Sequence, residues 1–296
     1  MPSHVQQRNV ALFGASGQLG SAIAGIVPSA IRVPWSLAEK WRQEEIRAWL
    51  KNLARQGKAD VIVANGITDP SRSAPELERS NHLFPAALLA AGRDYPDLRF
   101  LTIGSVMEAI PEMAARNRYI AGKRALSEDV AAAASTGMAG RVMHLRLHTL
   151  YGVGMPHQHM FLGQMFSSLC ADRPFEMTRG LQYRQYHHAE DIAAAIARLL
   201  DHDWLDMALY QINGRETLRL REIAESVFTY FGRTDLLRVG TLPEPVLDVS
   251  EMPTYVLTDT AIFSGGRPAL KRINVWLSEC FDKVSADRAD HQADQG

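Results

Sequence analysis

Residues 10–20 read VALFGASGQLG, and the rest of the chain is interpreted outward from this stretch. A short apolar run ends at Gly14, glycines recur at positions 17 and 20, and residues 21–27 continue with a composition compatible with a helix. This order predicts a strand, a tight turn and a helix. Gly14 permits the turn, Gly17 lets the backbone approach a bound anion, and Gly20 lets the helix pack on the strand.

The amides at the start of such a helix are suited to hold phosphate groups. The spacing G-x-x-G-x-x-G is one residue wider at the front than the dinucleotide fingerprint G-x-G-x-x-G, but the strand and helix context fits on both sides. The stretch therefore predicts a dinucleotide site with contacts from Gly14, Ser16, Gly17, Gln18 and Leu19.

Composition and charge exclude several classes of protein. The 296 residues are 46% hydrophobic and carry a net charge of −1, so no basic excess suggests a nucleic-acid partner. Cys170 and Cys280 form neither a disulfide framework nor a metal set, and the histidine pairs lack carboxylates at ligand spacing, so no metal is expected. Without an apolar signal core or a run of membrane-spanning length, the sequence predicts a cytoplasmic protein with no membrane partner.

The choice between the two dinucleotides depends on the residues that follow the second predicted strand, 29–34. Enzymes that prefer NAD place an acid about 20 residues after the first glycine, where it bonds the ribose 2′-hydroxyl. No acid stands there, whereas Arg32 and Ser36 are suited to accept a 2′-phosphate. These residues favour NADP(H) over NAD(H).

Apolar strands alternate with helices along the first half of the chain, which predicts a doubly wound parallel sheet of the Rossmann type. Ligands bind such sheets at the carboxyl ends of the strands, where Asn65 and Gly66 follow a buried strand. Further strands are expected at 98–105 and 142–147. The expected helices span residues 37–56, 80–91, 117–134, 189–197, 217–231 and 266–284.

The second half changes character and predicts a smaller lobe. We expect a dinucleotide-binding domain over residues 1–152, to which 187–215 returns, and a substrate-binding α/β lobe over 153–296, with a cleft between them.

Ser105, Tyr119 and Lys123 form the predicted catalytic set. Tyr119 and Lys123 are four residues apart and share one helix face, so the ammonium is expected to lower the pKa of the phenol. Ser105 follows a strand and is placed to polarise a substrate carbonyl. A tyrosine of this kind exchanges a proton with the substrate oxygen while a hydride is transferred.

With these motifs in order, the chain resembles the extended short-chain dehydrogenase/reductase family, the NAD(P)-dependent nucleotide-sugar epimerases, dehydratases and reductases. Asn81 matches a helix asparagine of the family, and residues 146–152 and 210–214 match two further segments. His148 or Thr149 stands near the asparagine expected in the first of these segments, and His148 is the predicted cofactor contact. Arg184 opens a segment in which the family's arginine contacts the nucleotide diphosphate. The resemblance also implies a homodimer through the helices that begin near Ser80 and Tyr119.

Departures from the family pattern narrow the expected reaction. Sugar dehydratases place an Asp-Glu pair after the serine or threonine, but Ser105 is followed by Val106-Met107-Glu108. Dehydration is therefore disfavoured, and the missing acid after the second predicted strand favours NADP(H)-dependent reduction of a 4-keto nucleotide-diphospho sugar or deoxysugar. A nucleotide-sugar 4-epimerase with retained NAD and a non-catalytic nucleotide-sensing member remain as alternatives. Glu108 and Asn117 are not included in the predicted catalytic set.

Overall fold

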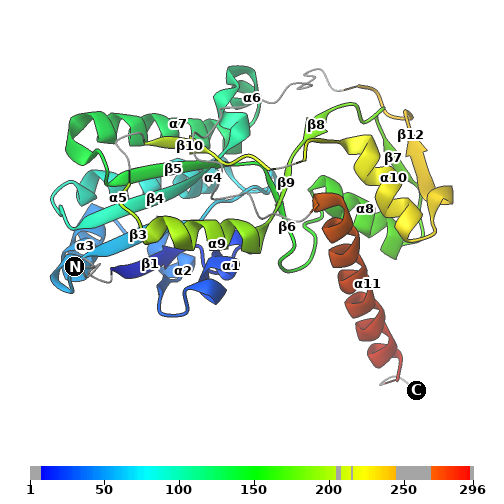
Figure 1. Cartoon of the computed structure of the whole chain (residues 1–296), viewed down its shortest axis with the longest axis horizontal. Helices are drawn as coiled ribbons and strands as arrows, with labels where there is room; N and C mark the ends of the chain where they lie inside the picture. The colour runs from blue at the N-terminus through cyan, green and yellow to red at the C-terminus, as the bar shows by residue number, and fades with distance from the viewer. Residues whose placement is uncertain (1–7, 205–207, 215, 245–267, 294–296) are drawn as a thin grey trace, which may run out of the picture. The chain divides into compact units, whose positions relative to one another are not determined.

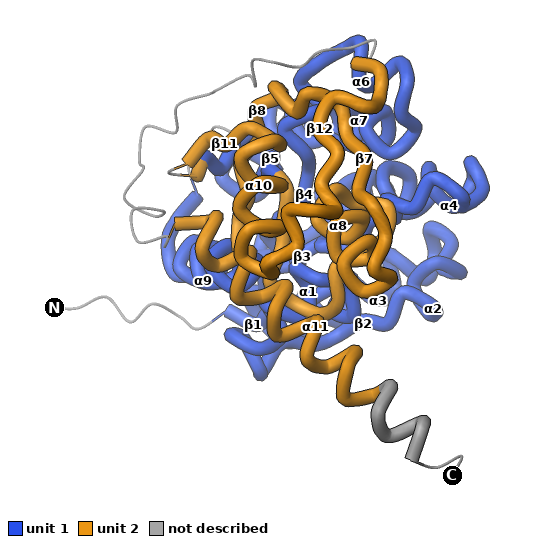
Figure 2. Tube along the Cα trace, turned by 90° about the vertical axis from the view of Figure 1, so that its right-hand side faces the viewer, with its two compact units in different colours: residues 1–148, 189–213, 253–264 blue, residues 149–188, 214–252, 265–296 orange. Residues whose placement is uncertain are grey.

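The computed structural model describes residues 8–204, 208–214, 216–244 and 268–293. These residues form two compact units. Unit 1 runs up to His148 and includes Ala189–Asn213, and unit 2 contains Thr149–His188 and the described residues from Gly214 onward. Figure 2 colours the two units separately.

Unit 1 is built on one six-stranded parallel sheet, and its strands follow the apolar runs of the sequence. They are β1 (Asn9–Phe13), β2 (Ile31–Val33), β3 (Ala59–Val63), β4 (Leu98–Ser105), β5 (Val142–Leu147) and β10 (Leu209–Gln211). The order across the sheet is β10-β5-β4-β3-β1-β2. The chain moves outward from β1 to β2 and then returns to β3 on the other side of β1, so the topological switch point lies between β1 and β3.

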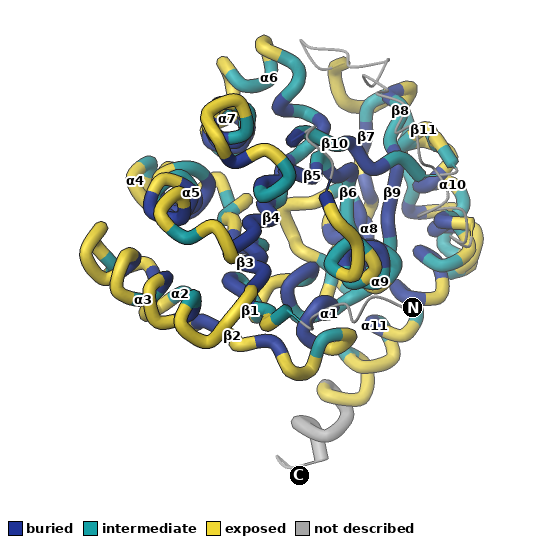
Figure 3. The backbone as a smooth tube through the Cα atoms, turned by 60° about the vertical axis from the view of Figure 1, so that its left-hand side comes forward, coloured by how far each residue is buried: buried dark blue, intermediate teal, exposed yellow. Residues whose placement is uncertain are grey.

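Helices cover both faces of this sheet, which confirms the predicted doubly wound fold (Figure 1). Their bounds are α1 (Gln18–Ile26), α2 (Trp35–Ala38), α3 (Gln43–Arg55), α4 (Ala74–Glu78), η1 (Arg79–Leu83), α5 (Phe84–Gly92), η2 (Val106–Ala109), α6 (Pro111–Arg116), α7 (Arg118–Ala133), η3 (Ala134–Met138) and α9 (Ala189–Leu200). α3, α5 and α7 lie on one face, and α1 packs with α9 on the other. The central strands β3, β4 and β5 between them are largely buried, whereas the edge strand β2 is mostly exposed (Figure 3).

An aromatic cluster closes the core beneath the start of the glycine loop. The ring of Phe13, the last residue of β1, lies 5.1 Å from that of Trp49 and 5.3 Å from that of Phe84. Its neighbour Leu12 is fully buried on the opposite face of the sheet, as the alternation of side chains along a strand requires. The strand therefore enters the loop from a fixed position.

The structure corrects two expected helices. The helix predicted over residues 37–56 is divided into α2 and α3, because the chain is extended at Arg42 and the guanidinium of Arg79 binds the backbone carbonyl oxygens of Glu39 and Trp41. The helix predicted from Ser80 begins earlier, at Ala74. Ser73 caps it, and the N–H of Ser73 donates to the Glu76 carboxylate over 3.0 Å.

Unit 2 has its own core and only short strands. Its elements are β6 (Thr149–Tyr151), α8 (Phe161–Cys170), β7 (Phe175–Met177), β8 (Tyr183–Arg184), β9 (Tyr186–His188), β11 (Leu218–Arg219), α10 (Leu220–Tyr230), η4 (Thr234–Leu236), β12 (Leu237–Val239) and α11 (Ala269–Ala293). The strands pair as β6 with β9, β7 with β12 and β8 with β11. Within the described ranges, no helix has both the length and the apolar character required to cross a bilayer.

Candidate active site

The glycine loop joins β1 to α1 as a tight turn. Gly14 has φ +81°, in the left-handed region that favours glycine, and the N–H of Gly17 donates to the carbonyl oxygen of Gly14 over 3.0 Å. Gly17 is the N-cap of α1 and has no side chain to cover the first turn of the helix. The loop therefore ends in backbone amides at a helix N-terminus, which is an arrangement suited to an anion.

The three glycines have different reasons to lack a side chain. A Cβ at Gly20 would overlap the carbonyl oxygen of Gly14, so α1 approaches the turn as closely as backbone atoms allow. A Cβ at Gly14 would lie 2.5 Å from the backbone nitrogen of Asn65, so the turn after β1 touches the segment after β3. A Cβ at Gly17 would meet only the Gly14 oxygen, at 3.4 Å, and the space beside it is open.

The other residues predicted to contact the cofactor differ in how far their side chains are exposed. Ser16 is exposed, Gln18 begins α1, and Leu19 is buried in the core. Arg32 is exposed on β2, and its guanidinium donates to the carbonyl oxygen of Ala24 over 3.2 Å. Ser36 is exposed on α2.

Asn65 and Gly66 lie at the carboxyl end of β3, beside the glycine loop. The amide of Asn65 donates to the carbonyl oxygen of Ser80 over 2.8 Å, while its buried Oδ1 has no hydrogen-bond partner among the described residues. The following residue, Ile67, is held by the side chain of Asn81, which accepts from its N–H over 3.2 Å and donates to its carbonyl oxygen over 2.9 Å. Asn81 is fully buried and so fixes this segment to the helix behind it.

Lys123 extends from α7 to the same place. Its residue is 3% exposed, and Nζ donates to the carbonyl oxygen of Asn65 over 3.4 Å. A Cβ at Gly66 would lie 3.3 Å from Nζ, so this glycine leaves room for the ammonium. Burial lowers the pKa of Lys123 to about 8, although the negative charge of Glu108 acts in the opposite direction.

Tyr119 stands one turn before Lys123, in the first turn of α7. Asn117 caps this helix, and its Oδ1 accepts from the N–H of Tyr119 over 2.9 Å. Burial raises the pKa of the Tyr119 hydroxyl above its ordinary value, and the charge of Glu108 raises it further. This direction is opposite to the expected lowering by Lys123, because desolvation and a nearby carboxylate both disfavour a phenolate.

Ser105 is the last residue of β4 and also caps the short helix η2. Its Oγ accepts from the N–H of Met107 over 3.3 Å, and its own N–H donates to the Glu108 carboxylate over 3.0 Å. Because β1, β3 and β4 are adjacent parallel strands, the residues that follow them meet at one edge of the sheet. The glycine loop, Asn65 and Ser105 therefore share the edge that Lys123 reaches.

The two remaining predicted contact residues, His148 and Arg184, belong to different units. His148 follows β5 at this edge, and its Nε2 lies 3.3 Å from Asn213 Oδ1. Arg184 lies in unit 2 on β8, where its guanidinium donates to the carbonyl oxygen of Tyr183 over 2.7 Å. Its predicted contact with a nucleotide diphosphate stays a prediction.

Glu108 is the residue at this site that the predicted set omits. It is fully buried, bonds the backbone of Ser105, and acts on the pKa of both Tyr119 and Lys123. The spacing Ser105-x-x-Glu108 is that of a capping box, which was the available signal for a turn tied by this carboxylate.

Comparison with known proteins places the chain in a family. The sequence model described as the NAD dependent epimerase/dehydratase family matches residues 10–207. No curated protein sequence matches the chain significantly.

Solved structures of similar fold cover nearly the whole chain. MoeE5, solved in complex with UDP-glucuronic acid and NAD, is 18% identical with a TM-score of 0.74, covering 94% of this chain and 99% of its own. A UDP-N-acetylglucosamine 4-epimerase from Bacillus cereus is 14% identical with a TM-score of 0.69, covering 93% and 99%. A dTDP-4-dehydrorhamnose reductase from Clostridium acetobutylicum is 14% identical with a TM-score of 0.68, covering 91% and 98%.

At these identities the structural likeness establishes the fold, whereas the family model spans more than half of the sequence. The chain therefore belongs to the NAD dependent epimerase/dehydratase family of enzymes, and the resemblance read from its motifs is confirmed.

Proposed function

We propose that the chain reduces the 4-keto group of a nucleotide-diphospho sugar, with NADPH as the hydride source. The bound cofactor would supply the hydride, and the side chains of the protein manage the carbonyl oxygen and its proton. The observation that carries the proposal is the buried ammonium of Lys123, one helical turn after Tyr119, which donates to the carbonyl oxygen of Asn65 at the sheet edge that ends in the glycine loop and Ser105.

A dinucleotide fits the residues at this edge. The glycine loop offers amides at a helix N-terminus, the space beside Gly17 is open, and the buried Oδ1 of Asn65 needs a donor. We assign the pyrophosphate to the loop and a ribose to Lys123, next to Asn65. Arg32 on β2 and Ser36 on α2 are both exposed, and they are the proposed basis of a preference for NADP(H).

In the proposed step, Tyr119 donates its proton to the substrate oxygen as the carbonyl becomes an alcohol. A phenol that stays protonated at neutral pH is in the correct state for this direction of reaction, because no base is required first. Ser105 donates a hydrogen bond to the same oxygen, and Lys123 provides the positive charge that stabilises the phenolate left on Tyr119. Arg184 is assigned to the nucleotide diphosphate by its position in the motif.

A dehydratase function is not proposed. Elimination needs a second acid and base beside the tyrosine, and the sequence lacks the Asp-Glu pair that supplies them in dehydratases. The nearby carboxylate, Glu108, is bound by His144 Nε2 at 2.9 Å and by Arg146 Nε at 2.8 Å. These partners hold it as an ion rather than as a proton donor.

A nucleotide-sugar 4-epimerase is the second candidate. The observation in its favour is that MoeE5, of similar fold, was solved with UDP-glucuronic acid and NAD, as was a UDP-glucuronic acid 4-epimerase from Bacillus cereus. An epimerase would keep its cofactor through purification and show no net consumption of it, whereas a reductase would consume NADPH in proportion to product.

The test is to mix the purified protein with a panel of nucleotide 4-ketosugars and to follow the absorbance of NADPH and, separately, of NADH. We expect Tyr119→Phe to lower turnover by roughly 10²- to 10⁴-fold with cofactor binding retained. Tyr230→Phe, at an exposed tyrosine of α10, is the matched control and should leave turnover unchanged. If the Tyr119 variant binds cofactor and wild-type protein shows no turnover on any substrate, a non-catalytic sensor replaces the proposal.

A further inference from the structure

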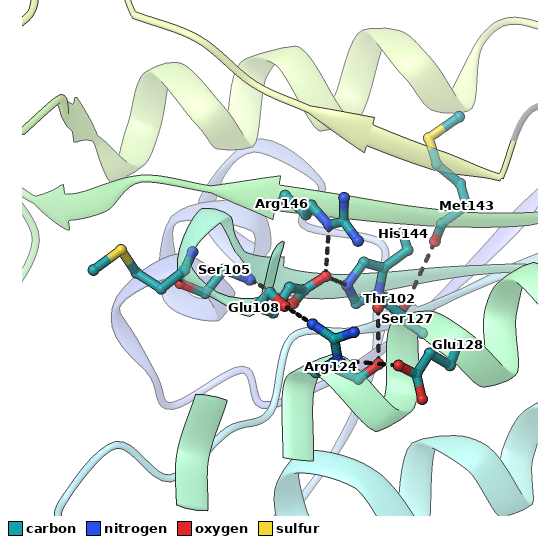
Figure 4. Close-up of polar contacts among 10 residues, drawn as sticks. Thr102, Ser105, Glu108, Arg124, Ser127, Glu128, Met143, His144 and Arg146 are labelled. Carbon is teal, nitrogen blue, oxygen red and sulfur yellow. Dashed lines mark hydrogen bonds and ion pairs between the residues drawn. The ribbon is translucent and has the colours of Figure 1, made fainter. Parts of the chain in front are cut away.

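Glu108 forms the centre of a buried polar network that the proposed reaction does not use. The carboxylate and the ring of His144 are both fully buried. Figure 4 shows the contacts that join them to their neighbours. One carboxylate oxygen accepts from His144 Nε2 at 2.9 Å and from Arg146 Nε at 2.8 Å, and the other accepts from the N–H of Ser105 at 3.0 Å. Thr102 completes the network, with Oγ1 lying 2.7 Å from His144 Nδ1.

The backbone is shaped to admit this network. A Cβ at Gly104 would overlap Nε2 of His144 and would lie 2.5 Å from Oε2 of Glu108, so the residue before Ser105 has no side chain because the hydrogen-bonded pair of His144 and Glu108 occupies that space. His144 and Arg146 stand two residues apart on β5, so both point to the same face of the strand and meet one carboxylate. The charge and its partners are thus positioned by two neighbouring strands.

The carboxylate is ionised in this setting. Burial by itself would raise the pKa of Glu108, but the charge and hydrogen bond of His144, with the hydrogen bond from Arg146, hold the pKa below its ordinary value. A buried carboxylate with this many donors is a fixed negative charge at neutral pH.

This charge is connected to each member of the predicted catalytic set. It is hydrogen-bonded to the backbone of Ser105, and its field acts on Tyr119 and on Lys123, both on α7. From the same helix, Arg124 donates to the backbone carbonyl oxygen of Glu108 over 3.4 Å. The carboxylate is therefore bonded by His144 and Arg146 of β5 and by the end of β4, and the charged or titratable side chains of α7 that it influences or that contact its backbone are Tyr119, Lys123 and Arg124.

We propose that Glu108 is a positioning residue of this active site. Its carboxylate fixes the turn that presents the Ser105 hydroxyl, and its fixed negative charge acts on the protonation of Tyr119 and Lys123. The proposal rests on the proposed hydride-transfer function. It assigns Glu108 no contact with the substrate.

The decisive variant is Glu108→Gln, which keeps the size of the side chain and removes its charge. We expect kcat for NADPH-dependent reduction to fall roughly 10- to 100-fold, as for a displaced catalytic group, with a smaller change in the Kd for NADPH. The pH above which kcat declines should move down by roughly one unit, because loss of a nearby carboxylate lowers the pKa of Lys123. Glu112→Gln, at an exposed carboxylate of α6, is the matched control and should change neither quantity.

A second measurement does not depend on turnover. The reactivity of Lys123 toward a trace amine-acetylating reagent, measured by mass spectrometry as a function of pH, reports the pKa of its ammonium directly. A lower midpoint in Glu108→Gln than in wild type supports the proposal, and equal midpoints overturn it. This readout holds even if no nucleotide sugar is reduced, an outcome that would count against the proposed function instead.

If Glu108→Gln does not fold, Glu108→Asp separates position from charge. The shorter carboxylate keeps the charge but withdraws from the N–H of Ser105, so kcat should fall while its pH profile keeps the wild-type shape. Wild-type kcat in this variant would overturn the positioning role.

Discussion

The ammonium of Lys123 donates to the backbone carbonyl oxygen of Asn65 across 58 residues of sequence, at a distance of 3.4 Å. This contact brings a buried cation from α7 to the carboxyl end of β3, beside the topological switch point of the sheet. Burial of a charge lowers the stability of the folded chain, and the buried charge of Lys123 lies at the edge where ligands bind doubly wound sheets.

The first prediction concerns that cost. Lys123→Met keeps the length of the side chain and removes the charge, so we expect the free energy of unfolding at pH 7 to rise by roughly 1–3 kcal/mol while reduction is lost. The pKa of Lys123 is about 8 in the folded chain against an ordinary 10.5, so below pH 8 both states are protonated and the full cost is present. Between these two values the folded chain loses its proton first, and the advantage of the variant should disappear as the pH rises. Urea unfolding at neutral and alkaline pH measures the difference; a gain that is independent of pH would contradict this account.

The second prediction separates two glycines of the same loop. Gly20→Ala should lower the free energy of unfolding by roughly 1–3 kcal/mol, because its Cβ would overlap the oxygen of Gly14 and force α1 away from the turn. Gly17→Ala places a methyl group at ordinary contact distance from protein atoms, so we expect near wild-type stability and weaker binding of NADPH. Thermal unfolding and cofactor titration on both variants decide the matter. Equal effects of the two substitutions on stability would show that the loop geometry is misassigned.

The third prediction tests the role of Asn81 behind the loop. Asn81→Ala leaves the N–H and carbonyl groups of Ile67 without their side-chain partner, which should cost roughly 1–3 kcal/mol of unfolding free energy. Amide hydrogen exchange at Ile67 should become faster. Asn52→Ala, at an exposed asparagine of α3, provides the control and should stay within roughly 0.5 kcal/mol of wild type.

The fourth prediction concerns the choice of cofactor. Arg32→Glu replaces the positive charge after α1 with a negative one that would repel a 2′-phosphate, so the ratio of kcat/KM for NADPH to that for NADH should fall at least roughly tenfold. Steady-state kinetics with both cofactors measure the ratio, with Arg47→Glu on the exposed surface of α3 as the control. A ratio unchanged from wild type would reject Arg32 as a specificity residue.

Much of unit 1 was predictable because its signals are local. The strands at 98–105 and 142–147 have the predicted bounds, and Asn117 stands as the cap before the helix expected from it. The division between α2 and α3 was not predictable, because it depends on Arg79, which binds carbonyl groups about 40 residues earlier in the chain. The role of Glu108 was not predictable for a similar reason, since its main side-chain partners, His144 and Arg146, lie on β5.

By itself the sequence determined the family and the class of fold, because hydrophobic periodicity and glycine spacing act over a few neighbouring residues, and it predicted the glycine loop, Asn65 and Ser105 at the carboxyl ends of their strands. The tertiary structure alone decided the electrostatic state of that edge. The raised pKa of Tyr119, the lowered pKa of Lys123 and the ionised Glu108 depend on burial and on charges brought together from β4, β5 and α7. Such energies are set by distance in space and by exclusion of water, and neither quantity is contained in the order of residues along the chain.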